Sequence, residues 1–335
     1  MARAKSVFAS RRRDVVVGIG DDAAVVKGSG DLAVTTDVLV LGQDFRADAD
    51  PRRLGRKALS VNVSDLAAMG ATPLWAVLTL GLPRETPTDW FEGFLQGFRS
   101  AANDYGVAVV GGDLSATGTT FASVTALGRA SAGGVLRRDG AGAGDALFVS
   151  GTLGAAAAGL ALLEAGFRLG NGDVSKVTAP RGRRLAPPRA TEVGRLIRHQ
   201  TDPRAQVELG KALAEDGLAS AAIDVSDGLA RDLHHLCRAS GVGAVLDAAA
   251  LPIDSALFDL KGLVTLDPRS AALYGGEDFG LLFSVPKRKL TAVERLSGRF
   301  ALRRIGTLND SGQVQLSGDG QSAPLPDAGF DHFAG

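Results

Sequence analysis

The sequence predicts a mixed α/β protein built from two domains. Its 335 residues correspond to about two domains of typical size. Short runs rich in β-branched residues alternate with longer segments of helical periodicity, a mixture typical of α/β and α+β folds. A glycine-rich turn, RRDGAGAGD at residues 137–145, separates two such series. We therefore expect one domain over residues 1–138 and a second over residues 139–335.

The elements of the first domain follow from their residue patterns. Strands are predicted for DVVVG, LAVTTDVLV, LWAVLTLGL, VAVVGG and FASVTALG. A helix of about five turns is predicted to begin after Asp50, a favourable N-cap that precedes Pro51, and to stop at Gly70. A second amphipathic helix is predicted to follow Thr88.

The second domain is predicted to begin with the strand ALFVSG and an alanine-rich helix, and to continue with further strands and helices. Residues 166–189 contain glycines, prolines and arginines without periodicity, so we expect a surface loop there. Two interpretations of its arginines stay open, a contribution to phosphate binding and a solvated charged face. These residues are Arg181, Arg183, Arg184 and Arg189.

Charge and cysteine content narrow the class of protein. Lys and Arg number 37 and so do Asp and Glu, so no net field attracts nucleic acid or an anionic membrane. The single cysteine, Cys237, excludes an intrachain disulfide, and its helical surroundings predict a small buried thiol rather than a nucleophile. No segment resembles a transmembrane span. These features predict a cytoplasmic protein.

Two acidic segments of the first domain raise the question of a metal. In VVVGIGDDAAVV a glycine turn of the kind that binds phosphate is followed at once by acids, including Asp22, which would repel phosphate unless a cation intervenes. In LAVTTDVL, Thr35, Thr36 and Asp37 are predicted at the end of a strand and carry the hard oxygen ligands that Mg²⁺ prefers. The alternative for each segment is an ordinary acidic turn.

The helix after Asp50 carries a carboxylate on its apolar side. Leu54, Ala58, Val61 and Asp65 fall at offsets of 0, 4, 7 and 11 and share one face. A buried charge needs a partner or a metal. Two interpretations of Asp65 stay open, a metal ligand and an ion pair with Arg or Lys at the edge of the stripe.

Three further segments repeat the same plan. In VAVVGGDLSATG a strand runs into a glycine pair ending at Gly112, followed by Asp113. In AAIDVSDGLARDL, Asp224, Ser226 and Asp227 lie between a strand and a helix, where Ser226 or Asp227 could be a simple N-cap. In YGGEDFGLLFSV the acids again separate a glycine pair from a buried strand. Together these acids predict a site for several Mg²⁺ ions that bind a polyphosphate.

The motifs VGIGDDAAVV, TTDVLVLGQDF, GRKALSVNVSDLAAMGATP, YGVAVVGGDLS, GAGAGDALFVSGTLG, IDVSDGLARDL and ALYGGEDFGLLF, in this order, resemble the thiamine-monophosphate kinase family. The resemblance covers nearly the whole chain. It implies the two-domain fold of the aminoimidazole ribonucleotide synthetase superfamily, with an N-terminal domain of mixed sheet and helices that binds ATP and metal and forms a homodimer. A C-terminal α/β domain would complete the active site.

The resemblance also implies roles for single residues. The implied magnesium ligands are Asp22, Thr35, Thr36, Asp37, Asp65, Asp113, Asp224 and Asp227, of which Asp65, Asp113 and Asp227 are the implied catalytic residues. Potassium is a further candidate cation. The implied ATP contacts are Tyr105, Gly112, Arg138 and Ser226, and the implied thiamine monophosphate contacts are Glu277 and the positions Asp44, Asp327 and Phe330.

Two of these positions depart from the family. Asp44 stands where a histidine is common, and a carboxylate would repel the substrate phosphate unless a cation or an arginine such as Arg46 compensates. Asp327 stands where an aromatic residue is expected to stack on thiamine, and Phe330 is the candidate substitute. The departures concern the acceptor more than the transfer of a phosphoryl group.

The implied reaction is direct in-line transfer of the γ-phosphoryl group of ATP to thiamine monophosphate. The acceptor phosphate is ionised at neutral pH, so positioning and charge neutralisation suffice without a general base. Two alternatives are a related ATP-dependent synthetase for another phosphorylated metabolite and a non-catalytic MgATP sensor. Neither a nucleic-acid nor a membrane partner is expected.

Overall fold

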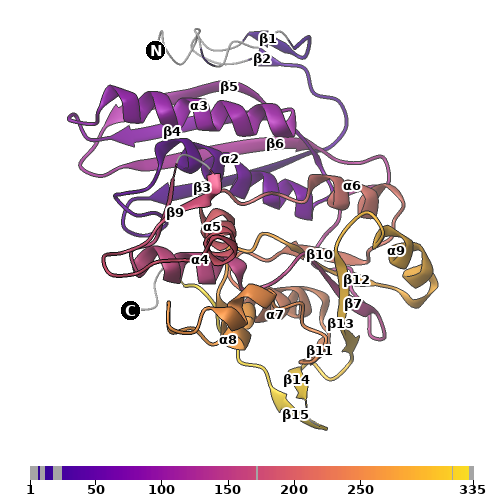
Figure 1. The fold of residues 1–335 in the computed structure, drawn as a ribbon. Coiled ribbons are helices and arrows are strands. Elements are labelled where there is room, and N and C mark those ends of the chain that lie inside the picture. The colour runs from indigo at the N-terminus through magenta and orange to yellow at the C-terminus, as the bar shows by residue number, and fades with distance from the viewer. Residues whose placement is uncertain (1–6, 8–11, 18–24, 171–172, 319, 332–335) are drawn as a thin grey trace. The chain divides into compact units, whose positions relative to one another are not determined.

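A computed structural model of the chain describes residues 7, 12–17, 25–170, 173–318 and 320–331. The chain forms two compact units, each described here by itself (Figure 1). The first contains residues 1–135 together with residues 207–215, and the second contains residues 136–206 and 216–335. No helix in these described ranges is long and apolar enough to cross a membrane.

The first unit is built on a four-stranded sheet with the order β3-β6-β4-β5. Its strands are β3 (Leu32–Val40), β4 (Thr72–Leu82), β5 (Ala108–Ala116) and β6 (Phe121–Arg129), and a separate hairpin joins β1 (Val15–Val17) to β2 (Val25–Val26). Strands β4 and β5 are parallel, whereas β6 runs antiparallel to both β3 and β4. The predicted strands of this domain are therefore confirmed, and β3 and β5 are the outer strands of the sheet.

Among its described residues the first unit contains the helices α2 (Pro51–Ala68), α3 (Thr88–Tyr105) and α6 (Val207–Glu215). Helix α2 has the predicted ends. The carboxylate of Asp50 accepts the N–H of Arg52 at 2.9 Å, and Gly70 follows the last turn with a φ of 67°. Leu54, Ala58 and Val61 are buried as the periodicity predicts.

Helices α2 and α3 approach until their backbones touch. A Cβ atom on Gly97 of α3 would lie 1.8 Å from the carbonyl oxygen of Arg52, and one on Gly55 of α2 would lie 2.1 Å from that of Phe94. Only glycine leaves room for such contact. The two helices that carry Asp65 and Tyr105 are thus fixed to each other by close packing.

The second unit contains a mixed seven-stranded sheet with the order β10-β12-β7-β13-β11-β14-β15. The strands are β7 (Ala146–Ser150), β10 (Ala221–Asp224), β11 (Gly243–Asp247), β12 (Leu281–Val285), β13 (Leu302–Asn309), β14 (Val314–Gly318) and β15 (Gln321–Pro324). Its α-helices are α4 (Ala155–Glu164), α5 (Pro187–Thr201), α7 (Leu229–Ser240), α8 (Pro268–Tyr274) and α9 (Leu290–Leu296), with short 3-10 helices η1 (Ser255–Asp259) and η2 (Lys287–Lys289).

The main core of this unit lies between the sheet and α7. Leu229, Leu233 and Leu236 of α7 are fully buried in one cluster with strand residues such as Ile223. Cys237 lies at the edge of the same cluster with 3% exposure, which confirms the predicted buried thiol. Burial raises the pKa of this thiol to about 11, so it stays protonated at neutral pH.

The structure corrects three expectations. Thr35, Thr36 and Asp37 lie in the middle of β3 and not at its end. Strand β5 continues through Gly111–Gly112 to Ala116, so Asp113 lies within the strand rather than after it. Residues 166–189 are not simply a loop, because β8 (Arg168–Gly170) and β9 (Asp173–Thr178) pair as antiparallel strands there. In the first two cases pairing with a neighbouring strand extended the predicted strand, and in the third two short segments pair with each other where no strand was expected.

Candidate active site

In the first unit, strand β3 and helix α2 bring two predicted metal ligands together. The hydroxyl of Thr35 donates to the Asp65 carboxylate at 2.5 Å. Asp65 is half-buried, next to the buried stripe of α2. A hydroxyl and a carboxylate at this distance offer two hard oxygen atoms, the ligands that Mg²⁺ prefers.

Thr36 and Asp37 share the strand but have different surroundings. Thr36 donates to the carbonyl of Val124 at 3.0 Å and also accepts the Thr125 hydroxyl at 3.2 Å. Asp37 pairs with Val124 across the ladder between β3 and β6. Successive strand residues point to opposite faces, so Asp37 shares a face with Thr35 and Thr36 does not.

Asp113 and Asp37 lie on the two opposite edge strands of the sheet. Asp113 belongs to β5, where it pairs with Thr79 of β4. The two central strands β6 and β4 separate β5 from β3. At ~4.8 Å per strand spacing, the two backbones are about 14 Å apart. Within one chain, Asp37 and Asp113 are therefore too far apart to share a metal ion.

Gly112 is required by strand packing. Its φ is 149°, and an added Cβ would lie 1.9 Å from the carbonyl oxygen of Leu78 on β4. The glycine that precedes Asp113 therefore allows close approach of a neighbouring backbone, a role separate from the ATP contact that the resemblance implies for Gly112.

Tyr105 and Asp44 both have local partners. The Tyr105 hydroxyl lies 3.1 Å from the hydroxyl of Ser60 on α2. The carboxylate of Asp44 accepts the N–H of Val40 at 2.7 Å and so closes the turn after β3. Arg46, the suggested compensating cation, pairs with Asp48 at 3.1 Å. A local turn contact thus explains how the carboxylate of Asp44 is accommodated.

In the second unit, the loop between β10 and α7 is organised around Asp232. One oxygen of its carboxylate accepts the N–H groups of Ser226, Asp227 and Gly228 at 3.0–3.2 Å. Burial, together with the charges of Asp224 and Asp227, raises the pKa of Asp232 to about 8. The N-cap of α7 is Gly228, without a side-chain cap, so Ser226 and Asp227 are not the simple caps that the alternative required.

The glycine–acid loop before β12 joins this loop. The N–H of Glu277 donates to the carbonyl of Ser226 at 2.7 Å. The C-terminal segment joins it as well, because the N–H of Phe330 donates to the carbonyl of Asp227 at 2.9 Å. The structure therefore brings together the predicted ATP contact Ser226, the predicted metal ligand Asp227 and the two predicted substrate contacts Glu277 and Phe330.

The remaining predicted contacts of the second unit lie at its surface. Asp327 forms an ion pair with Arg238 of α7. Partial burial raises the pKa of this carboxyl, but the hydrogen bond and the charge of Arg238 outweigh that effect and hold the pKa below its usual range. The side chain of Arg138 is exposed, and the Arg138 carbonyl accepts the Ser240 hydroxyl at 2.6 Å. Phe330 is 44% exposed.

The described residues contain no group of three or more His, Cys, Asp or Glu side chains arranged to hold a metal ion. Asp22, one of the predicted ligands, lies outside those residues. The predicted ligands that are described occur as separate sets: Thr35, Thr36, Asp37, Asp65 and Asp113 in the first unit, and Asp224 and Asp227 in the second.

Sequence reasoning missed three side chains that hold the second-unit loops: Asp232, Asp278 and Gln200. The carboxylate of Asp278 accepts the N–H groups of Gly154 and Ala156 at the start of α4. The amide of Gln200 donates to the carboxylate of Glu277. An acid in the first turn of α7 was a visible signal for Asp232, whereas the sequence around Gln200 carries none.

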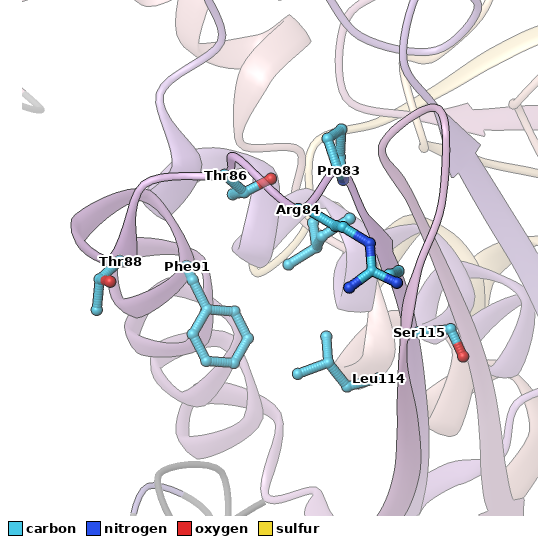
Figure 2. A pocket seen from close by; sticks show the side chains of 9 residues that line it. Pro83, Arg84, Thr86, Thr88, Phe91, Leu114 and Ser115 are labelled. Atoms are coloured by element: carbon cyan, nitrogen blue, oxygen red, sulfur yellow. The ribbon is translucent and has the colours of Figure 1, made fainter.

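A separate pocket of about 320 Å³ opens in the first unit where β4 and β5 end and α3 begins. Arg84, Phe91 and Leu114 surround it (Figure 2). None of the predicted site residues lines this pocket. The pocket residue Ser115 contacts one of them, because its hydroxyl donates to Asp113 at 3.2 Å.

Comparison with known proteins identifies relatives along nearly the whole chain. Residues 20–130 match the AIR synthase related protein N-terminal domain, and residues 142–319 match the corresponding C-terminal domain. The chain is 38% identical over 330 residues to a thiamine-monophosphate kinase of Salmonella typhimurium, covering 97% of this chain and 94% of that protein.

Two solved structures show the same likeness. The thiamine-monophosphate kinase of Stenotrophomonas maltophilia matches with a TM-score of 0.81 and 38% identity, over 96% of both chains. A structure described as AaThiL complexed with AMPPCP and TMP matches with a TM-score of 0.77 and 33% identity, over 98% of this chain and 94% of that one. The two-domain α/β fold predicted from the sequence is thereby confirmed.

Proposed function

Since this chain belongs to the thiamine-monophosphate kinase family of AIR synthase related proteins, we propose that it transfers the γ-phosphoryl group of ATP to thiamine monophosphate, with thiamine diphosphate and ADP as products. The chain is an ATP-dependent kinase whose acceptor is already a phosphate. The observation that carries this assignment is the likeness to kinases of this name along nearly the whole chain.

Magnesium is part of the proposal, and the chemistry of the donor set fits it. Threonine hydroxyls and aspartate carboxylates are hard oxygen ligands. The hydroxyl oxygen of Thr35 lies 2.5 Å from a carboxylate oxygen of Asp65. The residues proposed to hold the ions are Asp22, Thr35, Thr36, Asp37, Asp65, Asp113, Asp224 and Asp227. Bound magnesium would supply charge neutralisation for the phosphate oxygens. Potassium is proposed as an accessory cation, which replacing KCl with NaCl would test.

The chain's own residues have the task of orientation. Ser226, through its loop fixed by Asp232, is proposed to contact ATP, with Arg138, Gly112 and Tyr105. Glu277 and Phe330, which contact the same loop, are proposed to bind the thiamine part of the acceptor. The acceptor phosphate is ionised at neutral pH, so no residue has to remove a proton.

We also propose that the protein works as a homodimer. Val34 and Val38 of β3 are 63% and 48% exposed and, being four residues apart on a strand, lie on one face. Covering this apolar face with a second copy would remove it from water. Asp37 points to the other face of β3, but its separation from Asp113 also supports a dimer, because an outer strand of a second copy could bring its own Asp113 near Asp37.

Complementation tests the shared site. Asp37→Asn and Asp113→Asn are each expected to be inactive alone. In mixed dimers, one of the two sites would receive both intact carboxylates, so mixing the two variants after dissociation and reassembly is expected to restore up to about a quarter of the activity. No recovery in confirmed mixed dimers would show that the two carboxylates act within one chain.

A cytoplasmic location completes the proposal. The free and buried Cys237 supports a reducing compartment, where unpaired thiols persist. Fractionation of the native host with antibody detection tests this location.

The central experiment measures thiamine diphosphate formation from ATP, Mg²⁺ and thiamine monophosphate, with EDTA as a control and free thiamine as a parallel acceptor. We expect metal-dependent product from the monophosphate only. Binding of MgATP with no product from either acceptor would favour the sensor alternative. Product only from another phosphorylated metabolite would favour a related synthetase.

A further inference from the structure

The loop that carries Glu277 has a strained backbone. Glu277 and Phe279 have φ angles of 57° and 48°, which residues with side chains rarely adopt. Such strain persists only where surrounding contacts over-determine the conformation. Here the N–H of Glu277 donates to the carbonyl of Ser226, and the N–H of Phe279 donates to that of Val225 at 2.8 Å. The backbone of the loop is thus fixed by the β10–α7 loop.

Between these two residues, Asp278 attaches the loop to helix α4. Its carboxylate accepts the N–H of Gly154 at 2.6 Å and that of Ala156 at 3.1 Å, both at the helix N-terminus. Backbone N–H groups at that end have no partner within the helix, so an acidic side chain there is stabilised. The side chains of Asp278 and Glu277 therefore have separate anchors.

The side chain of Glu277 is held by the last turn of helix α5. The Gln200 amide donates a hydrogen bond to one carboxylate oxygen of Glu277. Gln200 is only 6% exposed, so its amide has little access to water as an alternative partner. A buried amide that keeps its hydrogen bond is costly to separate from its acceptor, so the contact restricts the rotamers of Glu277.

Helices α4 and α5 form a common support for the two anchors. A Cβ atom on Gly159 of α4 would lie 2.2 Å from the carbonyl oxygen of Leu196 and 3.0 Å from the Cβ of Gln200. The helices also share a buried cluster that includes Leu162 and Val193. Gln200 is therefore held against α4, the helix to which Asp278 attaches the loop.

We infer that Gln200 is a positioning residue. It holds the Glu277 carboxylate where the negative charge of Glu277 contacts the cationic or hydrogen-bond-donating part of the acceptor, thiamine monophosphate. This inference rests on the proposed function. A glutamine amide is neutral, so it donates a hydrogen bond and leaves the negative charge of its partner in place. An arginine in the same position would neutralise that charge. The nearest arginines on α5 have other acidic partners, since Arg195 pairs with Asp254 and Arg198 with Asp202.

A carboxylate accepts about four hydrogen bonds on its two oxygens, so a bond from Gln200 does not by itself exclude a donor on the substrate. The thiazolium ring and the aminopyrimidine of thiamine supply a cation and N–H donors, respectively. The phosphate group would be repelled by Glu277, so the inferred contact concerns the organic part of the acceptor alone.

The test is steady-state kinetics of Gln200→Met, which keeps the length and volume of the side chain and removes the donor. The matched control is Gln96→Met, on the exposed face of α3. We expect the KM for thiamine monophosphate to rise about tenfold, as for loss of one hydrogen bond to a charged group. The KM for ATP and the circular dichroism spectrum should remain those of the wild type, and Gln96→Met should change none of these.

Glu277→Gln and the double variant complete the test. Gln200→Met is expected to add no further loss in the Glu277→Gln background, because Gln200 acts through that carboxylate. Equal rises in both KM values, or additive losses in the double variant, would overturn the inference in favour of a general structural role. A normal KM in Glu277→Gln would overturn it by removing the substrate contact. Failure of the wild-type chain to form thiamine diphosphate would instead reject the proposed function, and the inference with it.

Discussion

Replacing Gly97 with alanine should separate the two helices that frame the first-unit site. The new Cβ would lie 1.8 Å from the carbonyl oxygen of Arg52, which belongs to the backbone of α2 and cannot rotate away. Non-bonded carbon and oxygen atoms need roughly 3 Å or more, so the helices must move apart by more than about 1 Å. Because α2 carries Asp65, the contact between Asp65 and Thr35 should be displaced as well.

Two opposing contributions set the expected size of the effect. Overpacking a close contact costs about 1–3 kcal/mol, and a backbone neighbour favours the upper end of that range. Alanine in a helix is favoured over glycine by roughly 1 kcal/mol. The free energy of unfolding should therefore fall by about 2 kcal/mol in Gly97→Ala.

Urea titration of the protein, monitored by circular dichroism, measures this change in the free energy of unfolding. The control is Gly118→Ala, where no atom lies within 4 Å of the new Cβ, so that position should be unchanged or slightly stabilised. Kinase assays across a magnesium titration should show that Gly97→Ala needs more Mg²⁺ for half-maximal rate. If Gly97→Ala unfolds at the same urea concentration as Gly118→Ala, the reasoning about backbone contact is refuted.

Three further predictions follow from single contacts. Asp65→Asn should abolish phosphoryl transfer while leaving the circular dichroism spectrum unchanged, and a near-normal rate would remove Asp65 from the mechanism. Arg195→Ala should lower the free energy of unfolding by about 2 kcal/mol in urea titrations, because the buried Asp254 loses two hydrogen bonds of 2.6 and 2.7 Å. Partial screening of Arg195 by water keeps the expected loss at this size. A loss no larger than in Arg198→Ala would contradict this expectation. Burial raises the pKa of Asp278 to about 7, so the protonated form stabilises the fold at low pH and that contribution is lost as pH rises through about 7. The free energy of unfolding of Asp278→Asn relative to wild type, measured in EDTA, should therefore increase from pH 5 to pH 8. A constant difference would rule out this titration.

Sequence patterns alone were enough to predict most of the local elements and the family of the protein. Asp50 and Gly70 define the ends of α2 because capping and left-handed termination depend on a few adjacent residues. The β-branched runs became strands, and the pattern around Cys237 correctly indicated a buried thiol. The repeated glycine–acid segments carried the resemblance to a kinase family, which the comparisons confirm.

Which of these side chains contact one another depends on the packing of distant elements. Strand order is a non-local property, so nothing in either motif indicated that Asp37 and Asp113 occupy opposite outer strands of one sheet. The hydrogen bonds between Thr35 and Asp65 and between Gln200 and Glu277 form through packing of elements that are distant in sequence. Local patterns depend on the propensity of neighbouring residues, whereas these contacts depend on how helices and strands pack together. The residues that hold a charge in place therefore became visible only in the folded chain.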